Sequence, residues 1–189
     1  MPTPRIPMLA PDSAAAAAEE IGVPAQLAEL NIFRLLLRRP RTAKAINDML
    51  LSMLFGGALD DHLHELMIMR LGWATQCDYD WTQHWTVAQD VFGCSPEQLM
   101  AVRDWEHSEI LGEAERLVLQ ATDETLATGA VSNSTIERCR EVLGSDDAVV
   151  ELVLAIGAWR TISQVARSLD IPLEEGVASW PPDGVAGQA

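Results

Sequence analysis

The stretch QCDYDWTQHW, residues 76–85, collects side chains that can carry out acid–base or thiol chemistry. Cys77, Asp80 and His84 recur at i, i+3 and i+7, so on a helix they would share a stripe about 60° wide. A thiol, a carboxyl and an imidazole on one stripe favour a site where histidine transfers protons beside a cysteine. The alternative is a hydrogen-bonded core histidine next to a buried structural cysteine, because both residue types also occur inside helical proteins.

A second carboxyl comes from the preceding apolar segment, 62–74, which contains Glu65. One straight helix through both segments would hold Glu65 and His84 roughly 28 Å apart. A turn midway between them would instead make two antiparallel helices and bring these side chains level. We therefore expect Glu65 to orient and charge His84. Cys77 would then lie at or just before a helix N-terminus, which lowers a thiol pKa, while Asp80 opposes that shift.

Other kinds of site have little support in the sequence. His62 and His64 are spaced i, i+2, so they face different sides of a helix, and we predict no metal site. Cys77 and Cys94 would lie at opposite ends of one helix, about 25 Å apart, and Cys139 belongs to a distant element, so no disulfide is expected. There is no glycine-rich phosphate loop and no Gly-x-Ser-x-Gly elbow, and we predict no cofactor.

The charge balance bears on possible partners. The formal charge is −15, from 13 basic and 28 acidic residues. Binding to nucleic acids or anionic membranes requires clustered Lys and Arg, so we expect neither as a partner. The one basic cluster, 34–41, predicts a solvated helix face or end, with an anion or interface contact as the alternative. No signal peptide, bilayer-spanning apolar run or close cysteine pair is visible, and we expect a reduced, cytoplasmic protein.

Most of the chain has helical periodicity, with no sustained alternation and no Asn-Gly hairpin. We predict an all-α fold of roughly seven or eight helices. The expected helices cover 27–39, 41–55, 62–74, 78–92, 95–102, 112–128, 132–144 and 145–169. Pro40 should end the first of them, and Ser134 with Glu137 should form the capping box of the helix over 132–144.

The ends of the chain differ from this helical middle. A proline-rich start and an alanine-rich run predict an N-terminal arm and short helix over 1–23, followed by a single helical domain over 24–172 and a tail over 173–189. The segment 149–165 is apolar on more than one face, so we expect it to be central or covered by another subunit. An obligate homo-oligomer is therefore the expected state.

The segment HELMIMRLGWATQCDYDWTQH, residues 64–84, resembles the signature of the carboxymuconolactone decarboxylase / alkyl hydroperoxidase D-like family. The family pattern has a Glu, a Cys twelve residues later, a Cys or acidic residue three further on, and a His after four more. Glu65, Cys77, Asp80 and His84 stand at these positions.

The resemblance also includes the PRIPML start and the segment 157–169, and it covers about residues 30–170. It implies an all-helical subunit that assembles through helical hairpins into dimers, trimers or hexamers. The site would lie around the Glu–Cys–His cluster, near a subunit boundary. One branch of the family uses a Cys-x-x-Cys dithiol against hydroperoxides, and the other decarboxylates a γ-lactone acid without a cofactor.

Asp80 replaces the second motif cysteine, so the thiol that resolves a sulfenic acid in a dithiol peroxidase is missing. We therefore predict a cofactor-independent, lyase-like enzyme that performs decarboxylation, isomerisation or lactone chemistry on a small carboxylated or lactone-type molecule. His84 would transfer the proton, Glu65 would tune it, Asp80 would be a second acid–base group or polar anchor, and Cys77 would line the pocket or act as a nucleophile.

The expected substrate pocket is aromatic, which suits a small and partly apolar molecule. Arg160 would hold a substrate carboxylate or, alternatively, form a surface or interface salt bridge. The predicted pocket residues are Tyr79, Trp81, Trp73, Trp159 and Arg160. Two other functions stay open, a single-cysteine peroxidase or redox protein of the same fold and a non-catalytic helical oligomer that binds a small ligand.

Overall fold

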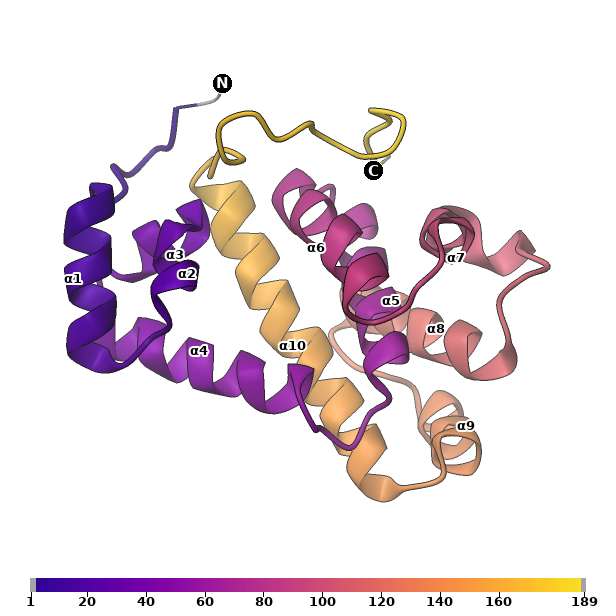
Figure 1. The fold of residues 1–189 in the computed structure, drawn as a ribbon. Helices are drawn as coiled ribbons and strands as arrows, with labels where there is room; N and C mark the ends of the chain where they lie inside the picture. Colours follow the sequence, from indigo (N-terminus) through magenta and orange to yellow (C-terminus); the bar gives the residue numbers. More distant parts are fainter. Residues whose placement is uncertain (1–2, 188–189) are drawn as a thin grey trace. The chain divides into compact units, whose positions relative to one another are not determined.

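A computed structural model describes residues 3–187, and within that range it contains ten α-helices, one 3-10 helix and no strand (Figure 1). The all-α class predicted from the sequence is confirmed. The helices are α1 Pro11–Ile21, α2 Ala25–Glu29, α3 Asn31–Leu36, α4 Pro40–Leu54, α5 Asp61–Ala74, α6 Asp78–Asp90, α7 Pro96–Ala101, the 3-10 helix η1 Val102–His107, α8 Glu113–Thr128, α9 Asn133–Leu143 and α10 Asp146–Ser168.

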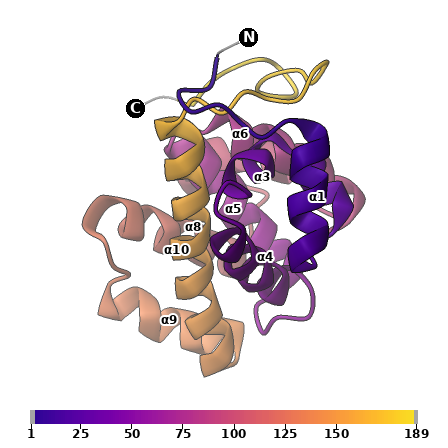
Figure 2. The same ribbon diagram turned by 90° about the vertical axis from the view of Figure 1, so that its left-hand side faces the viewer.

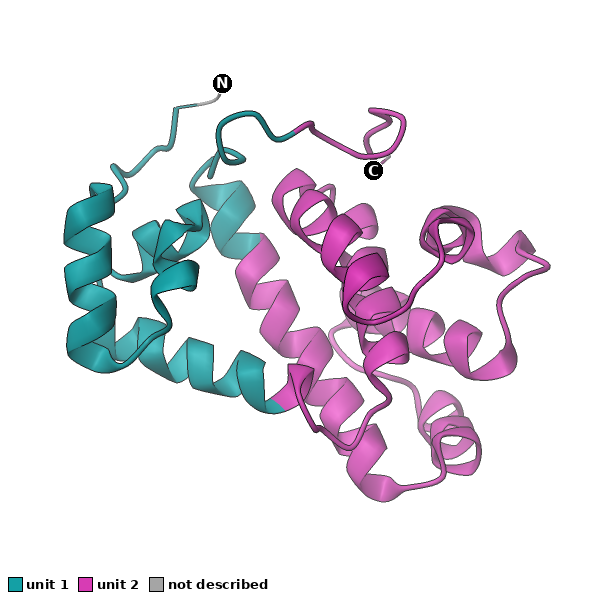
Figure 3. Ribbon diagram, viewed as in Figure 1, with its two compact units in different colours: residues 1–52, 164–177 teal, residues 53–163, 178–189 magenta. Residues whose placement is uncertain are grey.

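The chain packs as two compact units (Figure 3). Unit 1 comprises residues 1–52 and 164–177, and unit 2 comprises 53–163 and 178–189. The four motif residues all belong to unit 2. The domain boundaries expected from the sequence, 1–23, 24–172 and 173–189, remain a prediction.

In unit 1, α1 packs beside α2 and α3 (Figures 1 and 2). The single helix expected over 27–39 is wrong, because Leu30 adopts an extended conformation and separates α2 from α3. The backbone N–H of Asn31 donates to the Glu174 carboxylate at 2.8 Å, so a side chain supplies the acceptor that a continuous helix would have supplied. Pro40, expected to end this helix, is the first residue of α4. At that position its missing N–H has no cost, because the first N–H groups of a helix have no partner within the helix.

The basic cluster of unit 1 holds the N-terminal arm. Arg34 donates to the carbonyl of Leu9 at 2.9 Å, and Arg38 donates to the carbonyl of Pro7 at 3.0 Å. Two of the clustered guanidinium groups therefore satisfy carbonyl groups of an extended segment that has no helical partners of its own.

Unit 2 is built around α5 and its antiparallel partner α6 (Figure 1). Gln76 occupies the left-handed region at φ 57°, which reverses the chain between these helices. Gly72 allows the two backbones to approach closely, since an added Cβ would lie 3.0 Å from the backbone nitrogen of Trp81. Five apolar side chains of α5 are completely buried: Leu66, Met67, Ile68, Met69 and Leu71.

Two helix starts in unit 2 show how local sequence fixes the boundaries. Asp60 caps α5 by accepting from the backbone N–H groups of His62 and Leu63. The capping box expected for α9 is wrong: Ser132, two residues earlier than Ser134, accepts from the N–H of Thr135.

One helix of the described range, α10, is long and apolar enough to cross a membrane by length and composition. Half of its most apolar window is buried inside the protein, and core helices of soluble proteins pass the same test. Its exposed apolar side chains include Val150, Val153 and Leu154.

Candidate functional site

The centre of the candidate site is a buried pair formed by α5 and α6. His84 Nδ1 and Glu65 Oε2 are 2.9 Å apart, and the Glu65 side chain is completely buried while that of His84 is 18% exposed. The second carboxylate oxygen, Oε1, is also buried, and no group of the described residues hydrogen-bonds to it. A buried acceptor without a partner costs free energy, so the site is suited to receive a donor from a ligand or water.

The charge on His84 is controlled by this carboxylate. Burial alone would lower the His84 pKa, but the charge and hydrogen bond of Glu65, with a contribution from Asp80, outweigh burial and raise it. The pair therefore binds a proton more tightly than a free imidazole does, and that proton lies on the Nδ1 side of the ring, toward Glu65.

Asp80 belongs to a second polar chain that also includes α10. Asp80 Oδ2 lies 2.5 Å from Ser163 Oγ, which lies 2.9 Å from Thr75 Oγ1. Thr75 Oγ1 in turn donates to the carbonyl oxygen of Leu71 at 2.7 Å. Asp80 and Ser163 are 3% and 1% exposed, and burial raises the Asp80 pKa.

Cys77 directly precedes α6 and is 1% exposed. Its thiol hydrogen-bonds with Asp80 and Ser163, and burial together with the Asp80 charge raises its pKa to about 12. The sequence suggested that the helix N-terminus would lower this pKa, but desolvation of the thiolate has the larger effect. The Cys77 thiol is therefore protonated at neutral pH.

Trp159 of α10 lies between two histidines. Its indole N–H donates to His84 Nε2 at 3.4 Å, and its ring meets the His64 ring edge-on with centroids 4.8 Å apart. Among the pocket residues expected from the sequence, Trp159 is thus the one in contact with the Glu65–His84 pair.

Sequence reasoning missed His64, which is 1% exposed. Burial lowers its pKa, although Glu65, Glu151 and the nearby Met53 carbonyl act in the opposite direction. Neither ring nitrogen makes a hydrogen bond of ordinary geometry within the part of the chain that the structure describes. No local signal distinguishes His64 from His62, because the packing of α10 decides which ring is buried.

The other expected pocket residues lie elsewhere in unit 2. Trp73 and Trp81 contact each other at 5.3 Å between centroids and both contact Trp180, so the expected C-terminal tail is partly packed. Trp81 donates to the carbonyl of Pro181, Arg103 stacks over both Trp73 and Trp81, and Tyr79 is buried. Arg160 is exposed and donates to the carbonyl of Thr125 at 3.3 Å.

A further cluster joins α5 to the segment after α6. His62 Nδ1 lies 3.4 Å from Cys94 Sγ, and His62 Nε2 lies 3.0 Å from Glu115 Oε1. Burial raises the pKa of Cys94 to about 12. His62 connects these elements, because its two ring nitrogens face different partners. Within residues 3–187, no group of three or more potential ligands is arranged to hold a metal.

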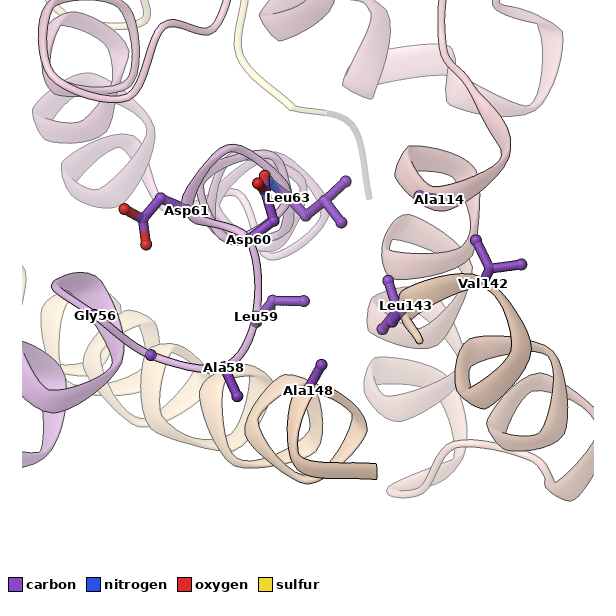
Figure 4. A pocket seen from close by; sticks show the side chains of 11 residues that line it. Gly56, Ala58, Leu59, Asp60, Asp61, Leu63, Ala114, Val142, Leu143 and Ala148 are labelled. Atoms are coloured by element: carbon purple, nitrogen blue, oxygen red, sulfur yellow. The ribbon is translucent and has the colours of Figure 1, made fainter. Parts of the chain in front are cut away.

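The hollow drawn in Figure 4 lies at the start of α5 and has a volume of about 630 Å³. It is lined by Gly56, Gly57, Ala58, Leu59, Asp60, Asp61, Leu63, Ala114, Val142, Leu143 and Ala148. None of these residues was expected in the site, and the lining does not include Glu65 or His84. The hollow is therefore distinct from the polar cluster.

Residues 40–124 match the model of the carboxymuconolactone decarboxylase family. This part of the chain is similar to that family. The matched segment contains Glu65, Cys77, Asp80 and His84, so the family resemblance stated from their spacing is confirmed. Trp159 and Ser163, which complete the cluster, lie outside the match. No curated protein matches the chain by sequence.

Solved structures share the fold of this chain over most of its length. An uncharacterized peroxidase-related protein from Ralstonia eutropha JMP134, solved as an alkylhydroperoxidase AhpD core, has a TM-score of 0.73 at 17% identity over 98% of this chain and 99% of that chain. A protein of unknown function from Agrobacterium tumefaciens has a TM-score of 0.64 at 24% identity, over 72% of this chain and 94% of its own.

A third similar structure is a cysteine-to-alanine variant of the debrominase Bmp8 in complex with 2,3,4-tribromopyrrole. It has a TM-score of 0.68 at 17% identity and covers 93% of this chain and 94% of that chain. At such identities the likeness shows the fold.

Proposed function

We propose that this protein is a cofactor-independent, lyase-like enzyme that transfers protons to and from a small carboxylated or lactone-type molecule. The observation that carries the proposal is the buried Glu65–His84 pair, with its 2.9 Å contact and its unpartnered Glu65 oxygen. Buried carboxylate–imidazole pairs with shifted pKa values are typical of acid–base catalysis.

Decarboxylation suits the protonation state of this pair. Loss of CO2 leaves an electron pair on carbon, and a proton must replace the carboxyl group. His84 is the donor in its charged form, which Glu65 stabilises by raising the pKa of the ring; once the proton has left, Nε2 can accept from the Trp159 indole. Trp159 limits the motion of the ring from its other side.

The single-cysteine peroxidase alternative has less support from the geometry. A peroxidatic cysteine reacts as the thiolate, whereas burial and Asp80 raise the Cys77 pKa to about 12. We therefore assign Cys77 to the wall of the site.

The debrominase neighbour was solved with a small ring compound, which supports the use of this fold for molecules of that size. The acidic surface and the exposed apolar residues of α10 support the further proposals that the enzyme is a cytoplasmic homo-oligomer and that neither nucleic acid nor membrane is its partner. The ligand-binding alternative predicts binding without turnover.

The test is turnover of carboxymuconolactone and of related small lactone acids and β-keto acids, followed by CO2 release and mass spectrometry. His84→Gln should lower kcat about 100- to 10,000-fold, the usual contribution of a general acid, with a smaller change in KM. Cys77→Ser should retain turnover. His107→Gln is the matched control, because His107 also contacts a carboxylate but is exposed.

Two results would contradict the proposal. Full turnover by His84→Gln would remove the assigned donor. Consumption of hydrogen peroxide by wild type but not by Cys77→Ser, without turnover of any acid in the panel, would favour the peroxidase alternative.

A further inference from the structure

The polar chain of Asp80, Ser163 and Thr75 contains more short contacts than its hydroxyl groups can supply with protons. Three oxygen–oxygen contacts run in series: Asp80 to Ser163 at 2.5 Å, Ser163 to Thr75 at 2.9 Å, and Thr75 to the Leu71 carbonyl at 2.7 Å. Each hydrogen bond needs one proton, and each hydroxyl group carries one. Ser163 and Thr75 together provide two protons for three contacts.

The far end of the chain cannot supply the missing proton, because the Leu71 carbonyl is only an acceptor. The Cys77 thiol hydrogen-bonds with Asp80 and Ser163, and its one proton serves those sulfur contacts rather than an oxygen–oxygen contact. If Asp80 were ionised, one of the short contacts would bring two lone pairs together in a buried environment. Such a contact is strongly unfavourable.

We propose that Asp80 is a neutral carboxylic acid in the resting protein, and that Ser163 and Thr75 are positioning residues that hold its proton. Asp80 then donates to Ser163, Ser163 donates to Thr75, and Thr75 donates to the carbonyl of Leu71. All three contacts are satisfied, and the direction of the chain is fixed.

The environment of Asp80 agrees with this assignment. The carboxyl group is 3% exposed, and burial raises its pKa. The titratable groups that face it are Cys77 and His84, and Ser163 faces it from α10. The charge of His84 is already balanced by Glu65 at 2.9 Å, so it does not require a second carboxylate.

The inference narrows the substrate class, and this part rests on the proposed function. With Asp80 neutral, the site holds one carboxylate, that of Glu65, and protonation of His84 cancels its charge. An ionised Asp80 would repel a substrate carboxylate, whereas a neutral carboxyl group whose proton is held by Ser163 adds no negative charge to the site. The site is therefore suited to a small anionic acid, and Asp80 contributes by carrying no charge rather than by contacting the substrate.

The experiment is infrared difference spectroscopy of the full-length protein near neutral pH. A protonated carboxyl group has a carbonyl stretch separated from the carboxylate stretches. The wild-type minus Asp80→Asn spectrum should contain one such stretch. In the Ser163→Ala protein the same stretch should shift, because its hydrogen-bond acceptor is gone. The control is Asp48→Asn, since Lys44 lowers the pKa of the exposed Asp48 carboxyl and its difference spectrum should contain carboxylate stretches alone.

Absence of the protonated stretch from the Asp80→Asn difference spectrum overturns the inference. A stretch that is present but unchanged in Ser163→Ala and in Thr75→Val overturns the positioning roles. The spectra require no substrate, so this result is separate from the turnover test: failure of His84→Gln to lower kcat rejects the proposed reaction while leaving the protonation of Asp80 intact.

Discussion

Replacing Glu65 by Gln removes the charge of the central pair while keeping the shape of the side chain. The His84 ring lies 2.9 Å from a completely buried carboxylate, so the pair belongs to the buried class, in which removal of one partner costs about 3–5 kcal/mol. Exposed pairs contribute about 0–1 kcal/mol. We expect a loss near the lower end, about 3 kcal/mol, because His84 can release its proton when the carboxylate is gone.

The loss should depend on pH in a definite direction. The folded-state pKa of His84 is raised above its ordinary value of 6.5, so the folded protein binds this proton more tightly than the unfolded chain. The stabilisation is therefore fully present below about pH 6.5 and is lost as the pH rises through the folded-state pKa. Glu65→Gln should be more destabilising at pH 6 than at pH 9.

Urea unfolding followed by tryptophan fluorescence measures the free energy of unfolding at both pH values, and NMR titration of the ring protons measures the His84 pKa. The matched control is Asp104→Asn. Asp104 Oδ1 lies 2.8 Å from His107 Nδ1, but both side chains are more than three-quarters exposed. Equal effects of the two substitutions on stability, or an unchanged His84 pKa in Glu65→Gln, would refute the argument from burial.

Three further substitutions test how the helices are positioned. Asp60→Ala should cost about 1 kcal/mol in urea unfolding, because α5 loses its cap, and Asp60→Asn should restore most of it. Gly72→Ala should destabilise by about 1–3 kcal/mol, because the added Cβ lies 3.0 Å from the Trp81 backbone nitrogen; an unchanged midpoint would contradict the close approach. Gly157→Ala should stabilise the monomer by about 0.5–1 kcal/mol, because the added Cβ would contact nothing in this chain. If the same variant associates more weakly in sedimentation, α10 lies in an interface between subunits.

The pairing of Glu65 with His84 could be predicted because it depends on short-range sequence. The two residues lie on consecutive helices of similar length, and a turn midway between them makes them level. The structure places that turn at Gln76 and closes the contact to 2.9 Å. Helical spacing likewise placed Cys77 beside Asp80.

The rest of the cluster could not be predicted, because it depends on the packing of distant helices. Trp159 was expected near the site only as one of several tryptophans, and Ser163 had no distinguishing signal at all. Burial could not be predicted from the sequence either. It raises the pKa of Cys77, whereas the position of Cys77 at a helix N-terminus suggested a lower pKa. The break at Leu30 was missed for a related reason, since the acceptor for Asn31 comes from Glu174.

His64 and His84 show how packing separates two chemically identical rings. Burial lowers the pKa of both, and Glu65 acts in the opposite direction on both. The difference is a direct hydrogen bond. His84 Nδ1, on α6, lies 2.9 Å from the Glu65 carboxylate. His64, which directly precedes Glu65 in the sequence, projects from another side of α5. The net pKa shift is therefore upward for His84 and downward for His64. The pKa values of the two histidines facing Trp159 thus shift in opposite directions, because only one of the rings hydrogen-bonds to a buried carboxylate.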